Sequence, residues 1–135
     1  MDPVLLDTDV YSYLTRGADD PQGAPYRRHV TGRNVVISQI TAGALLFGAV
    51  RRSWSARRVQ DLQEKARGAV MLPLDFPVCV VYAQVKANLR TQGRIIGDND
   101  IWIAAFALRH SIPLVSNNRR HFENIPGLVL ITEAP

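Results

Sequence analysis

Two carboxylates stand at the start of a predicted apolar helix. Asp98 and Asp100 follow Gly97, and apolar residues then recur at helical spacing over residues 101–108. Acidic side chains are favoured at such a start because they cap free amides and face the positive end of the helix dipole. A cap is therefore one interpretation. Two carboxylates in one turn also leave a catalytic or metal-binding role open, and the rest of the chain must decide.

Further polar groups follow two short apolar runs. Val4–Leu6 predicts a buried strand that turns into a helix at Asp7-Thr8-Asp9, where Asp7 or Thr8 can act as a cap and Asp9 is interpreted as one. Residues 112–115 predict another buried strand, which ends at Ser116-Asn117-Asn118. In an open parallel sheet, ligands bind beyond the carboxyl ends of the strands. We therefore expect these groups to converge with Asp98 and Asp100 on one sheet edge.

Such a cluster has a definite chemistry. Carboxylate oxygens are the ligands that Mg²⁺ and Mn²⁺ prefer, and an ion held in this way activates water and stabilises a phosphoryl transition state. The residues therefore predict metal-assisted hydrolysis of phosphodiester bonds.

Short apolar strands alternate with helices along the 135 residues, a length typical of one domain, here 1–135. This alternation favours an α/β fold with a parallel sheet. Strands are predicted over residues 4–6, 34–38, 70–72, 112–115 and 128–131. The predicted helices cover residues 10–14, 41–50, 54–67, 75–90 and 98–108, with a loop over 17–32 that contains a short helix at 26–30.

Composition excludes several classes of protein. With 47% hydrophobic and 21% charged residues, the chain is not disordered. Its single cysteine, Cys79, is expected to be a buried thiol and excludes a disulfide framework or a zinc site built from cysteines. No apolar run is long enough to span a membrane, and the N-terminus does not have the pattern of a signal peptide, so we expect a cytoplasmic protein.

The net charge is +4, and arginine supplies most of the positive charge. A basic, arginine-rich surface suits a phosphate-bearing partner, although the composition of the genome is an equal explanation. The predicted helix 54–67 and the residues before it carry a basic cluster that either contacts RNA or an acidic partner or forms a solvated face. Its members are Arg51, Arg52, Arg57, Arg58, Lys65 and Arg67.

The order of these motifs and the residues in them resemble those of the PIN-domain ribonucleases, and among these the VapC toxins of bacterial and archaeal toxin–antitoxin pairs. The resemblance covers nearly the whole chain. Its motifs are Leu5-Leu6-Asp7-Thr8, Ser38-Gln39-Ile40-Thr41, Leu45 to Gly48, Gly93 to Ala105, Leu114 to Asn118 with His121-Phe122, and Ile125-Pro126-Gly127-Leu128.

The resemblance implies a three-layer sandwich with a parallel sheet of four to five short strands, and a site that holds Mg²⁺ or Mn²⁺. Asp7 would be the first metal-binding acid and Asp100 the third, with Asp98 a helper or a cap. Asn118 takes the fourth acidic position, where its amide can orient a water molecule or ligand. Ser116 stands where a hydroxyl can bond to the first acid.

One motif departs from the family. Its pattern Thr-x-x-Glu-Leu-x-x-Gly reads Thr41-Ala42-Gly43-Ala44-Leu45-Leu46-Phe47-Gly48 here, so alanine occupies the glutamate position. Alanine neither binds a cation nor accepts a proton, so metal affinity and water activation should both fall. We expect an inactivated variant, either engineered or naturally degenerate. The structural alternative for the glutamate is a capping box with Thr41.

The resemblance implies RNA as the substrate and a VapB-like antitoxin whose C-terminal segment covers the acidic site with an arginine against the carboxylates. It also implies a homodimer within a heterotetramer or larger complex, with no membrane. Two alternatives belong to other classes. One is a non-catalytic PIN-fold module that binds RNA or antitoxin. The other is a receiver-like phosphoryl-transfer domain, which is disfavoured because no lysine follows the Val115 strand.

Overall fold

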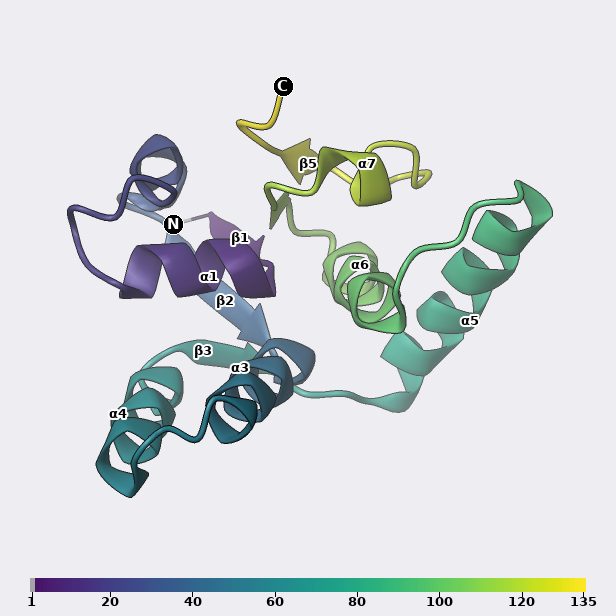
Figure 1. Ribbon diagram of the computed structural model, residues 1–135. Coiled ribbons are helices and arrows are strands. Elements are labelled where there is room, and N and C mark those ends of the chain that lie inside the picture. The colour runs from purple at the N-terminus through teal and green to yellow at the C-terminus, as the bar shows by residue number, and fades with distance from the viewer. Residues whose placement is uncertain (1) are drawn as a thin grey trace.

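Five parallel strands form one sheet in the order β3-β2-β1-β4-β5, so the first strand lies at its centre (Figure 1). The computed structural model describes residues 2–135. In chain order its elements are β1 (Pro3–Leu6), α1 (Thr8–Thr15), the 3₁₀ helix η1 (Ala24–Tyr26), α2 (Arg27–Val30), β2 (Asn34–Ser38), α3 (Gln39–Arg51), α4 (Ala56–Arg67), β3 (Val70–Leu72), α5 (Phe76–Thr91), α6 (Asp98–His110), β4 (Leu114–Val115), α7 (Arg119–Phe122) and β5 (Leu130–Ile131).

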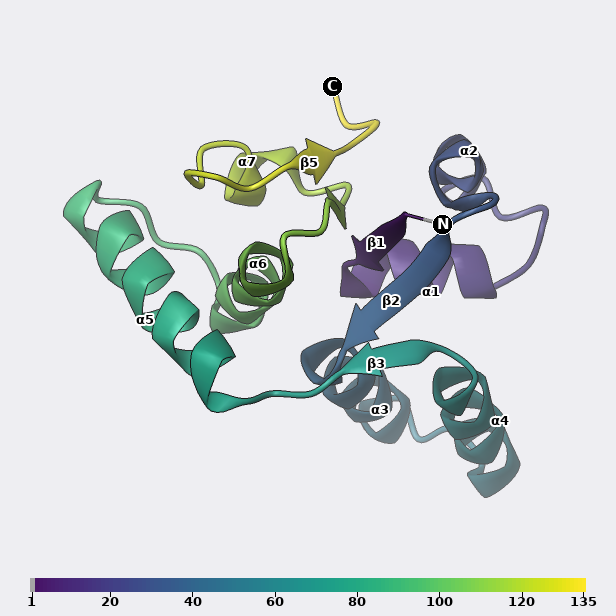
Figure 2. The same cartoon turned by 180° about the vertical axis from the view of Figure 1, so that it is seen from behind.

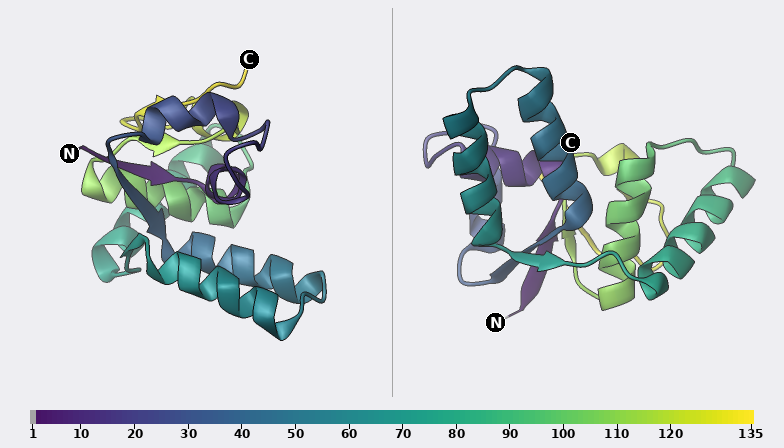
Figure 3. Two further views of the ribbon diagram at one scale, coloured as in Figure 1. Left: turned by 90° about the vertical axis from the view of Figure 1, so that its left-hand side faces the viewer. Right: turned by 90° about the horizontal axis from the view of Figure 1, so that it is seen from below.

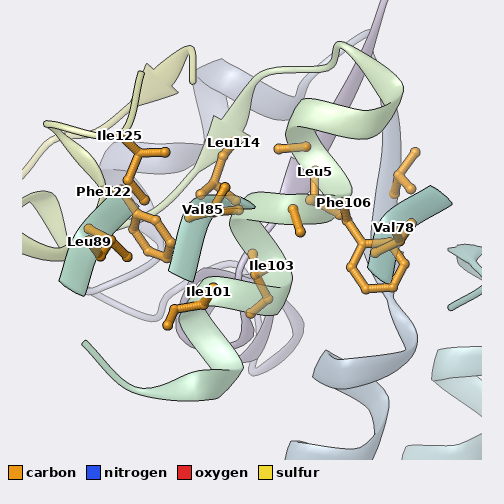
Figure 4. Close-up of a cluster of buried hydrophobic side chains, with 14 residues drawn as sticks. Leu5, Val78, Val85, Leu89, Ile101, Ile103, Phe106, Leu114, Phe122 and Ile125 are labelled. Atoms are coloured by element: carbon orange, nitrogen blue, oxygen red, sulfur yellow. The ribbon is translucent and has the colours of Figure 1, made fainter. Parts of the chain in front are cut away.

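Helices cover both faces of the sheet, and successive residues of each strand point to opposite faces. Val4 and Leu6 pack in one apolar cluster with α1 and η1, whereas Leu5 packs in the other with α5, α6 and α7. Figure 4 shows the second cluster, in which Phe106 and Leu114 are fully buried. The views in Figures 2 and 3 place the α3–α4 pair and the α5–α6 pair on opposite sides of the strands. The predicted α/β sandwich with a parallel sheet is confirmed.

Local capping chemistry explains where several helices begin. The Ser38 hydroxyl accepts from the Thr41 amide at the start of α3, and the Asp75 carboxylate accepts from the Val78 amide at the start of α5. Both start points agree with the sequence. Because Ser38 is the N-cap of α3, Thr41 is the third helical residue. The capping box between Thr41 and position 44 is therefore wrong.

Some boundaries and one burial state differ from expectation. The predicted strands 112–115 and 128–131 are only two residues long in the structure. Only their second halves form ladder pairs with a neighbouring strand. The segment 26–30 begins as η1 and continues as α2. Cys79 is half-buried on α5, so the expectation of a buried thiol is wrong. Between residues 2 and 135, no helix combines the length and apolar character needed to cross a membrane.

Candidate active site at the carboxyl edge of the sheet

The buried polar side chains of residues 2–135 all lie where strands end. They are Asp7, Ser38, Thr41 and Ser116, each no more than 4% exposed. Burying a polar group costs free energy unless it is hydrogen-bonded, so a cluster of this kind needs mutual partners. The carboxyl edge of β1, β2 and β4 is therefore the polar centre of the described chain.

Asp7 follows β1 directly and has both carboxylate oxygens occupied. Oδ1 accepts from the Val10 amide at 2.9 Å, which makes Asp7 the N-cap of α1. Oδ2 accepts from the Ser116 hydroxyl at 2.5 Å. Burial raises the pKa of Asp7 to about 6, although both hydrogen bonds act in the opposite direction, and the negative charges of Asp9 and Asp100 raise it further. Asp7 is thus held in place but poorly solvated.

Ser116 connects Asp7 to the segment after β4. Its backbone amide donates to the Ile131 carbonyl, and its hydroxyl oxygen accepts from the Asn118 amide at 2.9 Å while the hydroxyl hydrogen goes to Asp7. The hydroxyl therefore fixes the carboxylate and the following turn at once.

Asp100 and Asn118 meet at His121. The ring atom Nδ1 of His121 lies 2.5 Å from Asp100 Oδ2 and 2.7 Å from Asn118 Nδ2. One ring nitrogen cannot donate to the carboxylate and accept from the amide at the same time, so the two contacts belong to different tautomers. The carboxylate favours the tautomer with hydrogen on Nδ1. The sequence analysis gave His121 no role at the site, because a histidine in a short polar turn carries no signal of its own.

Asp98 lies apart from this group. Its side chain is 59% exposed and accepts from Lys86 Nζ at 2.9 Å and from the Tyr82 hydroxyl at 3.0 Å, and these bonds lower its pKa, that to Lys86 most. The N-cap of α6 is Gly97, and no side chain caps it. The expectation that Asp98 or Asp100 caps this helix is therefore wrong, because their side chains are engaged elsewhere.

Asn117 also turns away from the acidic group. Its side-chain oxygen accepts from the hydroxyl of buried Tyr26 at 2.6 Å, and the same hydroxyl accepts from the Glu133 amide at 3.0 Å. Tyr26 thereby ties the turn after β4 to η1 and to the C-terminal residues. Neither contact was foreseen, since the partners lie about 90 or more residues apart in the sequence.

Ala44 lies on α3 one turn after Thr41, so the two positions share a helix face. The Thr41 hydroxyl lies 3.1 Å from that of Thr8, the residue after Asp7. Position 44 is partly exposed and carries no polar group. The face of α3 that is tied to the start of α1 therefore has hydroxyls and a methyl group but no carboxylate.

A divalent ion fits this donor set only in part. Mg²⁺ is commonly held by one or two carboxylates, with water and substrate phosphates completing its shell. Asp7 and Asp100 are close enough for the charge of Asp100 to raise the pKa of Asp7. Within residues 2–135, no group of three or more Asp, Glu, His or Cys side chains is placed to hold an ion. The residues fit an ion shared with a substrate, and not one enclosed by protein ligands alone.

Known proteins share both sequence and architecture with this chain. Residues 4–128 match the PIN domain family. "Ribonuclease VapC2" of Haemophilus influenzae is 30% identical over 124 residues, which cover 92% of each chain, and "tRNA(fMet)-specific endonuclease VapC" of Shigella flexneri is 27% identical with the same coverage.

Among solved structures, VapBC-1 from nontypeable Haemophilus influenzae contains a chain that superposes with a TM-score of 0.80 at 27% identity, covering 96% of this chain and 97% of that one. This match shows that the alternative of a receiver-like domain is wrong. The strand order, the acidic sheet edge and these similarities lead to one conclusion: the chain belongs to the VapC family of PIN-domain proteins.

Proposed function

We propose that this chain is the toxin of a toxin–antitoxin pair, a metal-dependent endoribonuclease whose cleavage is impaired by Ala44. The observation that carries the proposal is the state of Asp7, a carboxylate held at the end of β1 by Ser116 and Val10 despite burial that raises its pKa to about 6. A buried acid with a perturbed pKa at a strand end is a mark of a functional site. The endonuclease names of the similar proteins support the same activity.

Asp7 and Asp100 would hold Mg²⁺ or Mn²⁺, with Asn118 orienting a water molecule or the substrate. When bound, the ion supplies a Lewis acid for the scissile phosphate and a more acidic water. Ser116 keeps Asp7 in one orientation by its hydrogen bond. His121 Nδ1 lies within hydrogen-bond distance of both Asp100 and Asn118, so the tautomer of the ring decides which of these two side chains it bonds.

Ala44 is proposed to occupy the position of the missing family glutamate. Its place one turn after Thr41, on the helix face bonded to Thr8, supports this assignment because a longer acidic side chain there would extend from the face nearest Asp7. The rest of α3 is regular and capped. Alanine removes one negative charge, which weakens ion binding and water activation together. An engineered change and natural degeneration both lead to this residue.

The proposed partners are RNA, a VapB-like antitoxin and a second copy of the chain in a heterotetramer or larger assembly. Large apolar side chains on the surface support association, since Phe47 on α3 is 66% exposed and Phe76 on α5 is 79% exposed. The second candidate is a non-catalytic PIN-fold module that binds RNA or antitoxin. Ala44 is the observation that favours it.

Cleavage of total RNA and of a structured RNA by the chain and by Ala44→Glu tests the proposal, each with Mg²⁺ and with EDTA. Ala44→Gln is the matched control because it adds the same length without charge. We expect only the glutamate variant to cut, and only with metal. If the glutamate variant binds RNA without cutting it, the nuclease proposal is wrong and the binding module replaces it.

A further inference from the structure

We use the name acidic edge for the carboxyl edge of the sheet where Asp7 and Asp100 lie. A cavity of about 590 Å³ lies beside it, between the end of α5, the loop 92–97 and the start of α6. We call it the α5–α6 pocket. Its walls carry the cations Lys86, Arg90 and Arg94 and the apolar side chains Leu89, Ile95 and Ile101. The single carboxylate in its wall is Asp98.

Of the three cations, only Arg90 has exposed donors that are free within residues 2–135. Lys86 is engaged with Asp98 and so neutralises that carboxylate. The exposed guanidinium of Arg90 makes no hydrogen bond or ion pair within the described chain. Arg94 donates through Nη2 to the Arg120 carbonyl at 2.9 Å, and its Nη1, which has no hydrogen-bond partner among residues 2–135, is buried and so is not open to the pocket. A pocket with one free guanidinium, a second positive charge beside it and its acid already paired favours an anion.

The pocket also has an apolar part that can contact an uncharged group of a ligand. Ile95 is 95% exposed in the loop, whereas Leu89 and Ile101 form a buried floor. A flat, partly apolar group that also carries a negative charge would satisfy both halves. A nucleotide has this combination, with a base that stacks on apolar side chains and a phosphate that binds guanidinium groups.

The pocket also adjoins the acidic edge through shared elements. Asp98 in its wall and Asp100 at the edge stand in the first turn of α6, and successive helical residues are about 100° apart, so these two side chains point to different sides. A helix with its side chains is about 10 Å across. Arg94 is bonded to the backbone of α7, which carries His121, the partner of Asp100. A strand of RNA that crosses the start of α6 would therefore reach both places.

We propose that the α5–α6 pocket binds a nucleotide of single-stranded RNA that flanks the one placed at Asp7 and Asp100. Arg90 holds its phosphate, Arg94 adds positive charge beside it, and Ile95 contacts its base above the buried Leu89. The inference depends on the proposed function for the identity of the ligand, and it assigns a binding role to residues outside the acidic edge.

The test measures binding of a fluorescein-labelled single-stranded RNA of mixed sequence to the unaltered chain by fluorescence anisotropy over a series of salt concentrations. Arg90→Ala should weaken binding about tenfold and reduce the slope of log affinity against log salt by about 0.7, the value for one phosphate contact on a single strand. Ile95→Ser should weaken binding by a smaller factor and leave the salt slope unchanged, because it removes an apolar contact. Arg109→Ala is the control, because Arg109 is an exposed arginine in the last turn of α6 that lies outside both the pocket and the basic cluster of α4.

An equal loss of affinity in Arg90→Ala and Arg109→Ala would overturn the proposal, since binding would then follow net charge alone. The proposal would also be overturned if Arg90→Ala lost antitoxin binding while its affinity for RNA stayed unchanged. Cleavage by Ala44→Glu with and without Arg90→Ala separates this inference from the nuclease. If Ala44→Glu cuts and Arg90→Ala leaves KM unchanged, only the pocket is wrong. If RNA binding depends on Arg90 but Ala44→Glu never cuts, only the nuclease proposal is wrong.

Discussion

The turns after β1 and β2 solve the same structural problem with different chemistry. Each strand leads directly into a helix at the same sheet edge, and each helix start is capped by a buried side-chain oxygen, from Asp7 in one and from Ser38 in the other. The Ser38 hydroxyl does this without charge. The Asp7 carboxylate does it at the cost of a pKa raised to about 6 by burial. A cap alone does not require an acid, and the proposed metal-binding role would account for the charge of Asp7.

The largest expected effect is on RNA cleavage, when the charge of Asp7 is removed from a chain in which Ala44→Glu restores the missing carboxylate on α3. In the Ala44→Glu background, Asp7→Asn should reduce RNA cleavage by a factor on the order of 10³, because the amide keeps a capping oxygen but loses the negative charge. Initial cleavage rates with Mg²⁺ measure this. Asp9→Asn, an exposed change in the first turn of the same helix, is the control. Equal rates in the two variants would mean that Asp7 serves only as a cap.

The same substitution should stabilise the fold at neutral pH. The pKa of Asp7 is higher in the folded chain, at about 6, than its ordinary value of 3.8, so between these values the folded state holds a proton that the unfolded state has lost. Stability therefore falls as pH rises through this window, by about 3 kcal/mol in total. Asp7→Asn removes this loss but also the hydrogen bond from the Ser116 hydroxyl, because an amide nitrogen does not accept, so its free energy of unfolding should exceed that of the parent by less than about 3 kcal/mol at pH 7.5 and should not exceed it at pH 4.

Urea denaturation in EDTA across this pH range measures the difference. Asp9→Asn should keep most of the pH dependence of the parent and reduce it only slightly, because the charge of Asp9 is a minor cause of the raised pKa of Asp7. A parent whose stability does not fall between pH 4 and pH 7 would show that water reaches Asp7 more freely than its burial indicates.

The contrast between the two turns also shows what the sequence can predict. Strands and helices follow from local alternation and capping residues, so their order was correct and the predicted boundaries lie within two residues of the observed ones, although the short helix α7 was not predicted. Asp7 and Ser116 were placed at one edge because a parallel sheet brings together residues that directly follow its strands. This inference needs only the topology. It does not need the direction of any side chain.

What the sequence could not predict depends on side-chain direction and on contacts between distant segments. Asp98 is one of two similar carboxylates in a single turn, and only the packing of α5 against α6 decides that it pairs with Lys86. Tyr26 reaches Asn117 across 91 positions of the sequence, and no local pattern encodes that bond. His121 meets Asp100 for the same reason.

The smallest effects should separate the hydroxyls that support the two turns. Ser116→Ala leaves the Asn118 amide and one oxygen of Asp7 without a partner, so it should cost about 1–3 kcal/mol of unfolding free energy and raise the pKa of Asp7 further. Thr41→Val keeps the shape of a buried side chain and frees only the hydroxyl of Thr8, so about 1 kcal/mol is expected. Urea denaturation at pH 7.5 measures both. Every variant that keeps Asp7 gains stability at pH 5, so each is compared with the parent at the same pH. Because only Ser116 bonds to the carboxylate, only the deficit of Ser116→Ala relative to the parent should shrink between pH 7.5 and pH 5. An equal shrinkage of the Thr41→Val deficit would mean that the charge of Asp7 acts on both turns.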